Sequence, residues 1–133
     1  MQRSKVLAQF EALEIMATPQ RLEVAEILLA KPQHLSAEQI IEKLRSHSST
    51  VSKATVYNTL NLFGEKGLVK ELVIDSERRF YDSSTHAHHH FYNVDTRELS
   101  DIEDSELHLL QLPEPPSGTK ADSVEILIKV SNR

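Results

Sequence analysis

The sequence contains no cysteine, and only three of its 133 residues are glycine. Without cysteine the chain can form no disulfide, no thiolate zinc site and no cysteine nucleophile. It also lacks any run near the roughly twenty apolar residues that span a bilayer. Glu11 and Glu14 interrupt the only early apolar run that could act as a signal core. We therefore expect a cytoplasmic protein of bacterial type that does not associate with membranes.

The charge of the chain changes between its two halves. Residues 1–67 hold eight Lys/Arg and seven Asp/Glu, a net charge of about +1. Residues 68–133 hold seven Lys/Arg and thirteen Asp/Glu, a net charge of −6, and they also hold five of the seven histidines. A chain of this length allows one ordinary domain or two very small ones. This asymmetry predicts that the two halves have different functions.

Apolar residues at helical spacing predict three helices in the first 50 residues. The first covers Ser4–Ile15. The second begins at the pair Thr18-Pro19 and runs to about Ala30, because Thr18 is a good N-cap and Pro19 suits the first helical position. The third begins at the capping box Ser36-Ala37-Glu38-Gln39.

A fourth helix is predicted from Ser52 to Lys66, with Gly67 as a left-handed stop. The side chains expected to pack inward are those of Val56, Leu60 and Phe63. The opposite face carries Ala54, Tyr57, Asn58 and Asn61. This outer face presents a ring and amides but almost no charge.

Two strand-like runs, 68–74 and 79–83, follow around the turn Asp75–Arg78. Three helices, a fourth with amides on its outer face, and a hairpin with Arg at its turn describe a winged helix-turn-helix. Asn can read adenine, Tyr can reach phosphate or a thymine methyl, and Arg78 or Arg79 can enter the minor groove or touch the backbone. The simpler alternative is a solvated helix face. A charge near +1 favours DNA binding only weakly unless dimerisation doubles the module.

The second half has little predicted helix. Its expected elements are strands at 88–101 and 123–130, a helical turn at 103–110 and a loop at 112–118. About fifty such residues bury little apolar surface alone, so we expect this half to dimerise through its sheet. The predicted fold class is α+β, with an N-terminal winged helix-turn-helix at residues 1–84 and a small α/β dimerisation and sensing domain at 85–133.

Three consecutive histidines, His88, His89 and His90, are the chemical centre of the sequence. If a strand begins near His88, alternation places His88 and His90 on one face and His89 on the other. Two imidazoles on one face can bind a divalent metal, and Asp82 lies just upstream to add an oxygen. Nitrogen and carboxylate ligands without thiolate suit Fe(II), Mn(II) or Zn(II). Metal or haem binding is favoured over a solvated loop, because each buried imidazole needs a partner.

From about Leu13 to Asp101 the chain resembles the Fur superfamily of metal-responsive repressors. The residues that carry the resemblance are Thr18–Arg21, His34–Glu38, Ala54–Leu60 and the group Asp82, His88 and His90. Within this superfamily the chain is most similar to the Irr branch of haem-linked iron-response regulators. These also lack the paired-cysteine zinc site, carry a three-histidine run followed by aromatics, and end in a segment like Leu112–Pro116.

The resemblance implies a metal site between the two domains. Its implied ligands are His34, Asp82, His88, His90 and Asp101, with Glu103 and Asp104 as neighbouring alternatives to the last. A metal that ties the first domain to the second would fix the angle between two winged helices, on which half-site spacing on DNA depends.

A second ligand site is implied less completely. His89 matches one position of the second metal site of other Fur proteins and His108 is the candidate for another, but Ala87 stands at a usual ligand position. In Irr proteins the three-histidine run is linked to haem, so the same imidazoles are alternatively axial haem ligands.

The resemblance also implies a mode of DNA binding by a homodimer on an AT-rich palindrome. Tyr57 would contact bases, and Arg21 and Thr55 would contact phosphate, with Ser52 and Asn58 as additional candidates. Asp82 stands where many iron sensors have Glu, which also resembles the peroxide-sensing branch. There, bound Fe(II) drives oxidation of a ligand histidine, which implies that His34 and His88 are the vulnerable residues here.

We therefore predict a dimeric, DNA-binding transcriptional regulator of iron, haem or peroxide response that is not an enzyme. One alternative is a metal-independent winged-helix regulator that keeps the ligands as a relic. Another, less favoured, is a metal-dependent hydrolase or oxygenase. It would need an open coordination position, a substrate pocket and an acid or base beside the metal. A short chain with three glycines offers little room for such a pocket.

Overall fold

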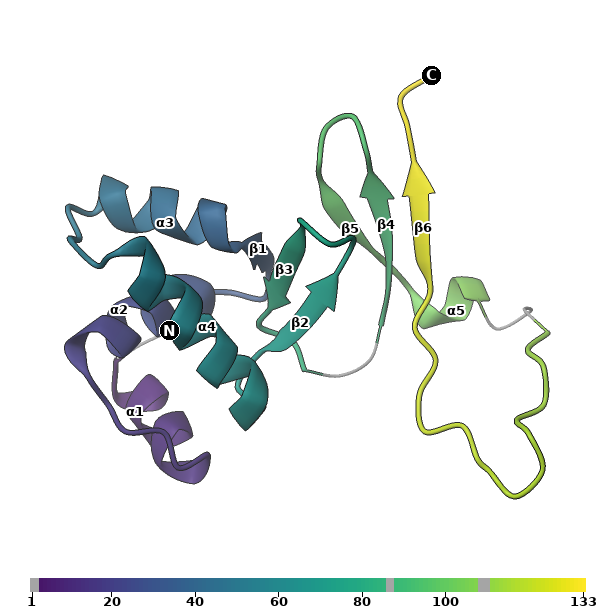
Figure 1. Cartoon of the computed structure of the whole chain (residues 1–133), viewed down its shortest axis with the longest axis horizontal. Coiled ribbons are helices and arrows are strands. Elements are labelled where there is room, and N and C mark those ends of the chain that lie inside the picture. The colour runs from purple at the N-terminus through teal and green to yellow at the C-terminus, as the bar shows by residue number, and fades with distance from the viewer. Residues whose placement is uncertain (1–2, 86–87, 108–110) are drawn as a thin grey trace. The chain divides into compact units, whose positions relative to one another are not determined.

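The computed structural model describes residues 3–85, 88–107 and 111–133, and the chain forms two compact units, Met1–Thr85 and His86–Arg133. Both helix and sheet are present, which agrees with the predicted α+β class (Figure 1). None of the described helices has the length and apolar character needed to cross a membrane.

The first unit packs four helices against a small antiparallel sheet. Its elements are α1 (Arg3–Ala12), α2 (Pro19–Leu28), β1 (His34–Ser36), α3 (Ala37–Ser46), α4 (Lys53–Lys66), β2 (Lys70–Val73) and β3 (Arg79–Asp82). The strand order is β1-β3-β2, so β3 pairs with both neighbours. This is the arrangement of helices and hairpin that the sequence predicted, with one added strand.

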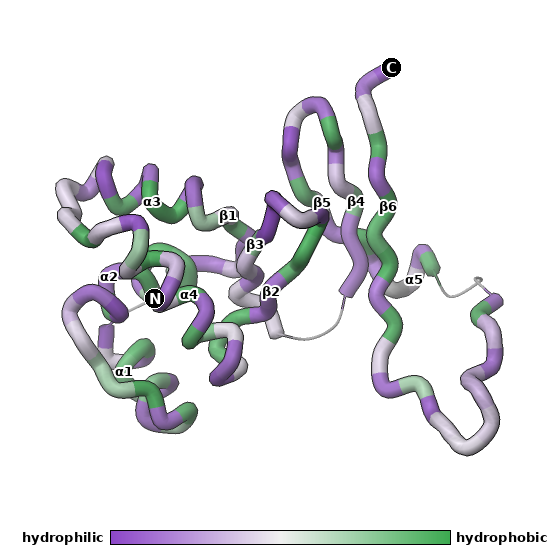
Figure 2. Tube along the Cα trace, viewed as in Figure 1, coloured by the Kyte–Doolittle hydropathy of each residue, from purple (hydrophilic) through white to green (hydrophobic). Residues whose placement is uncertain are grey.

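The core of this unit lies between the helices. Its largest fully buried side chains are Val6, Phe10, Val24, Leu28, Ile40, Leu44, Val56, Leu60 and Phe63. The rings of Phe10 and Phe63 pack with centroids 5.5 Å apart. Hydrophobic and hydrophilic residues alternate along the helix traces in Figure 2, as expected when only one face of each helix is buried.

Local capping sets most of the helix ends. The Thr18 side chain accepts a hydrogen bond from the Arg21 amide, Ser36 and Gln39 form the reciprocal capping box, and Ser52 caps α4. Gly67 ends α4 in the left-handed region at φ 80°, where a residue with a Cβ is disfavoured. These predicted helix ends are confirmed.

One prediction for the first unit is wrong, and one strand was missed. The first helix ends at Ala12 rather than Ile15, because the chain turns at Glu14, whose φ is 58°. Strand β1 was not predicted, since three residues are too few to show alternation. Its pairing with β3 is a long-range contact.

The second unit is a three-stranded sheet with one helical turn. Its elements are β4 (His89–Asn93), β5 (Leu99–Ile102), α5 (Asp104–Leu107) and β6 (Leu127–Val130). Strand β4 is central, antiparallel to β5 and parallel to β6. The long connection between α5 and β6 has no helix or strand in its described residues, 111–126.

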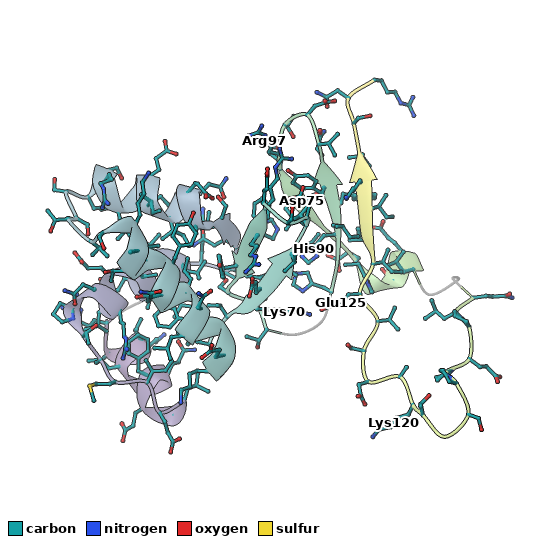
Figure 3. The ribbon with its side chains drawn as sticks, in the orientation of Figure 1. Lys70, Asp75, His90, Arg97, Lys120 and Glu125 are labelled. Atoms are coloured by element: carbon teal, nitrogen blue, oxygen red, sulfur yellow. The ribbon has the colours of Figure 1, made fainter. Side chains whose placement is uncertain are left out.

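The predicted single strand over 88–101 is wrong, because the chain reverses within it. The Asn93 side-chain oxygen accepts hydrogen bonds from the amides of Asp95 and Thr96, and Arg97, labelled in Figure 3, has a left-handed φ of 62°. Asn favours such turns because its side chain can replace a backbone acceptor. The turn folds β5 back along β4 and so decides which residues lie opposite the histidines.

Strand β6 begins at Leu127, four residues later than predicted. Two hydrogen bonds hold the residues just after β6 beside the end of β4. The Asn93 side chain donates to Asn132 Oδ1 over 2.9 Å, and the Asn132 amide donates to Asp95 Oδ2 over 2.8 Å. They add to the parallel pairing of β6 with β4, which runs from Leu127 to Val130.

Candidate metal centre and nucleic-acid interface

Two histidines and one aspartate converge on one face of the β4–β5 hairpin. Asp101 on β5 lies directly opposite His90 on β4, which places their side chains on the same face. His88 lies two residues before His90 and shares that face. The imidazole centroids of His88 and His90 are 4.5 Å apart.

The distances within this cluster suit a shared metal ion. The Nε2 atoms of His88 and His90 each lie 3.3 Å from the same Asp101 oxygen, Oδ1. This is longer than the usual hydrogen bond of about 2.9 Å. It is close to the separation of about 3.0–3.4 Å expected between neighbouring ligands that each lie about 2.1 Å from one ion. Two nitrogens and a carboxylate can therefore hold Fe(II), Mn(II) or Zn(II).

The cluster has a buried side and an open side. The side chains of His88 and His90 are 13% and 6% exposed, whereas that of Asp101 is 55% exposed. Figure 3 labels His90 on β4. An ion can therefore approach from the side of the aspartate, whereas His90 is buried on β4 and His88 lies just before that strand.

His89 points to the other side of β4 and makes a structural contact. Its Nδ1 atom accepts a hydrogen bond from the Ile126 amide over 3.0 Å, just before β6. The His90 amide in turn donates to the Ile126 carbonyl over 3.1 Å. Because Nδ1 accepts this hydrogen bond, the neutral ring carries its proton on Nε2. In this conformation neither nitrogen of His89 offers a lone pair to a metal or haem, and the side chain is buried.

We expect His89→Ala to lower the free energy of opening β6 from β4 by about 1 kcal/mol, because the Ile126 amide loses its acceptor. Amide hydrogen exchange measured at Ile126 should become faster. His89→Asn is the matched control, since its side-chain oxygen can take the place of Nδ1. Unchanged exchange in the alanine variant would show that the contact does not hold β6.

The other predicted ligands lie in the first unit. His34 on β1 and Asp82 on β3 are direct partners in the antiparallel register, so they share one face of that sheet. Asp82 is buried, and its Oδ1 atom accepts a hydrogen bond from the Ser84 amide over 2.8 Å. The first unit thus presents one imidazole and one carboxylate from adjacent strands. His108 lies outside the described residues.

Several predicted DNA-contacting residues gather at one polar pocket of the first unit. A hollow of about 250 Å³ is lined by Thr18, Gln20, Arg21, Thr55, Asn58, Thr59 and Leu62. Arg21, Thr55 and Asn58 thus meet where α2 and α4 lie side by side. Arg21 also donates to the Met16 carbonyl over 2.7 Å. Ser52 caps the same end of α4, with its hydroxyl donating to the Thr55 hydroxyl over 2.9 Å.

Tyr57 is exposed on α4 and is hydrogen-bonded to an acidic partner. Its hydroxyl donates to Glu38 Oε1 on α3 over 2.6 Å. This hydrogen bond, together with partial burial, raises the pKa of Tyr57 to about 12. Sequence reasoning missed Glu38, because its contact with Tyr57 spans 19 positions.

The β2–β3 hairpin carries a tight acidic turn. Asp75 Oδ1 accepts hydrogen bonds from the Glu77 and Arg78 amides, and the Ile74 amide donates to the Arg78 carbonyl. Arg79 is paired with Glu71 over 3.1 Å. Arg78 thus stands at a turn flanked by carboxylates, and Arg79 is engaged along the strand.

A family model decides the relationship of this chain to known proteins. The model of the ferric uptake regulator (Fur) family matches residues 12–128, which span both units. The chain belongs to the ferric uptake regulator family. The resemblance seen in the sequence is confirmed at the level of the superfamily, whereas the Irr branch is not distinguished.

Curated relatives of this Fur-family chain include peroxide-responsive repressors. It is 37% identical over 76 residues to PerR of Staphylococcus saprophyticus, covering 57% of this chain and 51% of that protein. It is 29% identical over 105 residues to PerR of Staphylococcus aureus, covering 79% of this chain and 71% of that protein. The chain thus spans about half the length of the first of these relatives. These relatives are regulators and not enzymes, in agreement with the prediction.

Solved Fur structures share the fold. The ferric uptake regulator of Pseudomonas aeruginosa with manganese has a TM-score of 0.73 at 23% identity, covering 95% of this chain and 96% of that one. The structure of the Vibrio cholerae ferric uptake regulator, which reveals a rearrangement of its DNA-binding domains, has a TM-score of 0.76 at 21% identity. The match covers 94% of this chain and 98% of that one. The α+β fold class, with a helical N-terminal domain and a small α/β domain, is thereby confirmed.

Proposed function

We propose that this Fur-family chain is a homodimeric, DNA-binding transcriptional regulator whose DNA affinity is set by a divalent metal. The observation that carries the proposal is the convergence of His88 and His90 on one oxygen of Asp101. A regulator needs a ligand site but no substrate pocket, and the donor atoms of this cluster support such a ligand site.

The proposed metal links the two units of the chain. We assign His88, His90 and Asp101 as ligands from the second unit, and His34 and Asp82 as ligands from the first. A metal bound by both groups would restrict the angle between the units, and in a dimer that angle sets the spacing of two DNA-reading helices. Manganese accompanies the P. aeruginosa regulator, and Mn(II), Fe(II) and Zn(II) all accept this donor set.

The proposed DNA surface is the outer face of the first unit. We assign base contacts to Tyr57 and Asn58, and phosphate contacts to Arg21, Thr55, Ser52 and Arg78. The meeting of Arg21, Thr55 and Asn58 at one pocket supports this assignment. An AT-rich palindrome is the proposed operator, since a two-fold symmetric dimer reads two equivalent half-sites. Location in the cytoplasm stays a prediction.

Peroxide response is the second candidate, favoured by the PerR relatives. Iron or haem response is the alternative suggested by the three-histidine run. The haem alternative has less support from the geometry, because His89 Nδ1 is occupied by the Ile126 amide and the other two imidazoles face Asp101.

We expect Mn(II) to change the affinity of the metal-stripped protein for an AT-rich palindromic duplex by at least tenfold, about 1.4 kcal/mol of coupling. Fluorescence anisotropy at fixed salt measures this change, and a parallel titration with haem tests the alternative. Tyr57→Ala should lose sequence-selective binding. Binding that ignores chelator, metal and haem alike would leave a DNA-binding protein with a relic site.

A further inference from the structure

We propose that Glu38 is a positioning residue for DNA recognition, which holds the Tyr57 ring on α4 in one orientation and so raises sequence selectivity. This inference rests on the proposed DNA-binding function and adds a residue that lies on α3, not on the helix that reads the bases. It concerns the first unit alone.

The contact between the two side chains is short and charge-assisted. The Tyr57 hydroxyl donates to Glu38 Oε1 over 2.6 Å, within the range expected for a hydroxyl bonded to a carboxylate. Tyr57 is 39% exposed, so core packing alone does not fix its ring. Tyrosine has only two side-chain torsions, and a hydrogen bond at the hydroxyl restricts both.

Glu38 is itself well anchored for this task. It lies in the first turn of α3, directly after the capped N-terminus, where the helix dipole favours a negative charge. Ser36 and Gln39 lock that turn by their reciprocal hydrogen bonds of 2.9 and 3.1 Å. The carboxylate therefore sits on a rigid helix end rather than on a loop.

The charge of Glu38 has an opposite effect on affinity. A carboxylate beside a DNA-reading side chain repels phosphates on any sequence, and phosphate contacts supply most of the non-specific affinity. Glu38 therefore lowers binding to all DNA while it preorganises Tyr57 for the correct bases. Positioning and charge can be separated, because glutamine keeps the acceptor oxygen and removes the charge.

The test is a double-mutant cycle on the full-length, metal-loaded protein. Its probes are a 30-base-pair duplex selected from random DNA by the wild-type protein and a scrambled duplex of the same composition. The ratio of the two affinities should fall by about tenfold in Glu38→Ala and in Tyr57→Phe. In the double variant this ratio should fall no further than in either single variant.

Two further variants separate the roles of Glu38. Glu38→Gln should keep the wild-type ratio while binding both duplexes more tightly. Glu42→Ala is the matched control, since it removes an exposed carboxylate from the same helix. A readout without DNA is the phenol titration of Tyr57, whose pKa of about 12 should move toward its ordinary value of about 10 in Glu38→Ala.

Each result decides the inference. The inference is supported if the two single variants lose the same share of the affinity ratio and the double variant loses no more than either. Additive losses, or an unchanged ratio in Glu38→Ala, overturn it while leaving the proposed function intact. A wild-type protein that binds both duplexes equally would overturn the proposed function, and the role of Glu38 with it.

Discussion

His90→Ala should weaken Mn(II) binding by at least about 100-fold, because it removes the more buried of the two imidazoles from the cluster. Loss of an outer partner of a metal ligand already costs about 10- to 100-fold in metal affinity, and loss of a ligand itself costs no less. Only two of the three proposed ligands of the second unit, His88 and Asp101, would remain to hold the ion.

Competition with a metal chelator measures this affinity directly and needs no DNA. His47→Ala is the matched control, because His47 is an exposed histidine of the first unit whose ring contacts Lys43 and Ser46. It should bind Mn(II) as the wild-type protein does. Near-normal Mn(II) affinity in His90→Ala would show that the cluster is not the metal site.

Phe63→Ala should lower the free energy of unfolding of the first unit by about 3–5 kcal/mol. Phe63 is fully buried and packs on Phe10 across α1 and α4. Removing its ring loses the burial of the phenyl group and leaves a cavity between the two helices, and both effects lower stability. The same helix carries Tyr57 and Asn58 on its outer face, so the loss should also reduce DNA binding at elevated temperature.

Chemical denaturation of the metal-free protein, followed by circular dichroism, measures this change. Asn61→Ala is the control on the same helix, since Asn61 is exposed, and its effect should stay within about 0.5 kcal/mol. A loss below about 1.5 kcal/mol in Phe63→Ala would mean that the surrounding helices close the cavity.

The predicted helix ends were correct wherever the signal was local. A cap residue and the amide that it satisfies are separated by three positions, so Thr18, Ser36 and Ser52 act before any tertiary contact forms. The same holds for Gly67, whose backbone freedom is a property of the residue itself. The first helix lacked such a stop signal, and its predicted end was wrong.

The prediction of the site depended on the same distinction. The shared face of His88 and His90 follows from strand alternation and needs only the sequence. The position of Asp101 opposite His90 depends on the reversal of the chain at Asn93 and Arg97, which the predicted single strand did not contain. The resemblance to the Fur superfamily supplied Asp101 where the residue pattern could not.

Composition, capping and periodicity were therefore enough for the fold class, for the helices of the first unit apart from the end of the first, and for the shared face of His88 and His90. Only the folded chain decided that His34 pairs with Asp82, that His89 holds Ile126, and that Glu38 holds Tyr57. The physical reason is separation along the chain. Interactions over three or four positions can be predicted from the local sequence. Contacts across 19 to 48 positions form only when the packed core brings distant elements together.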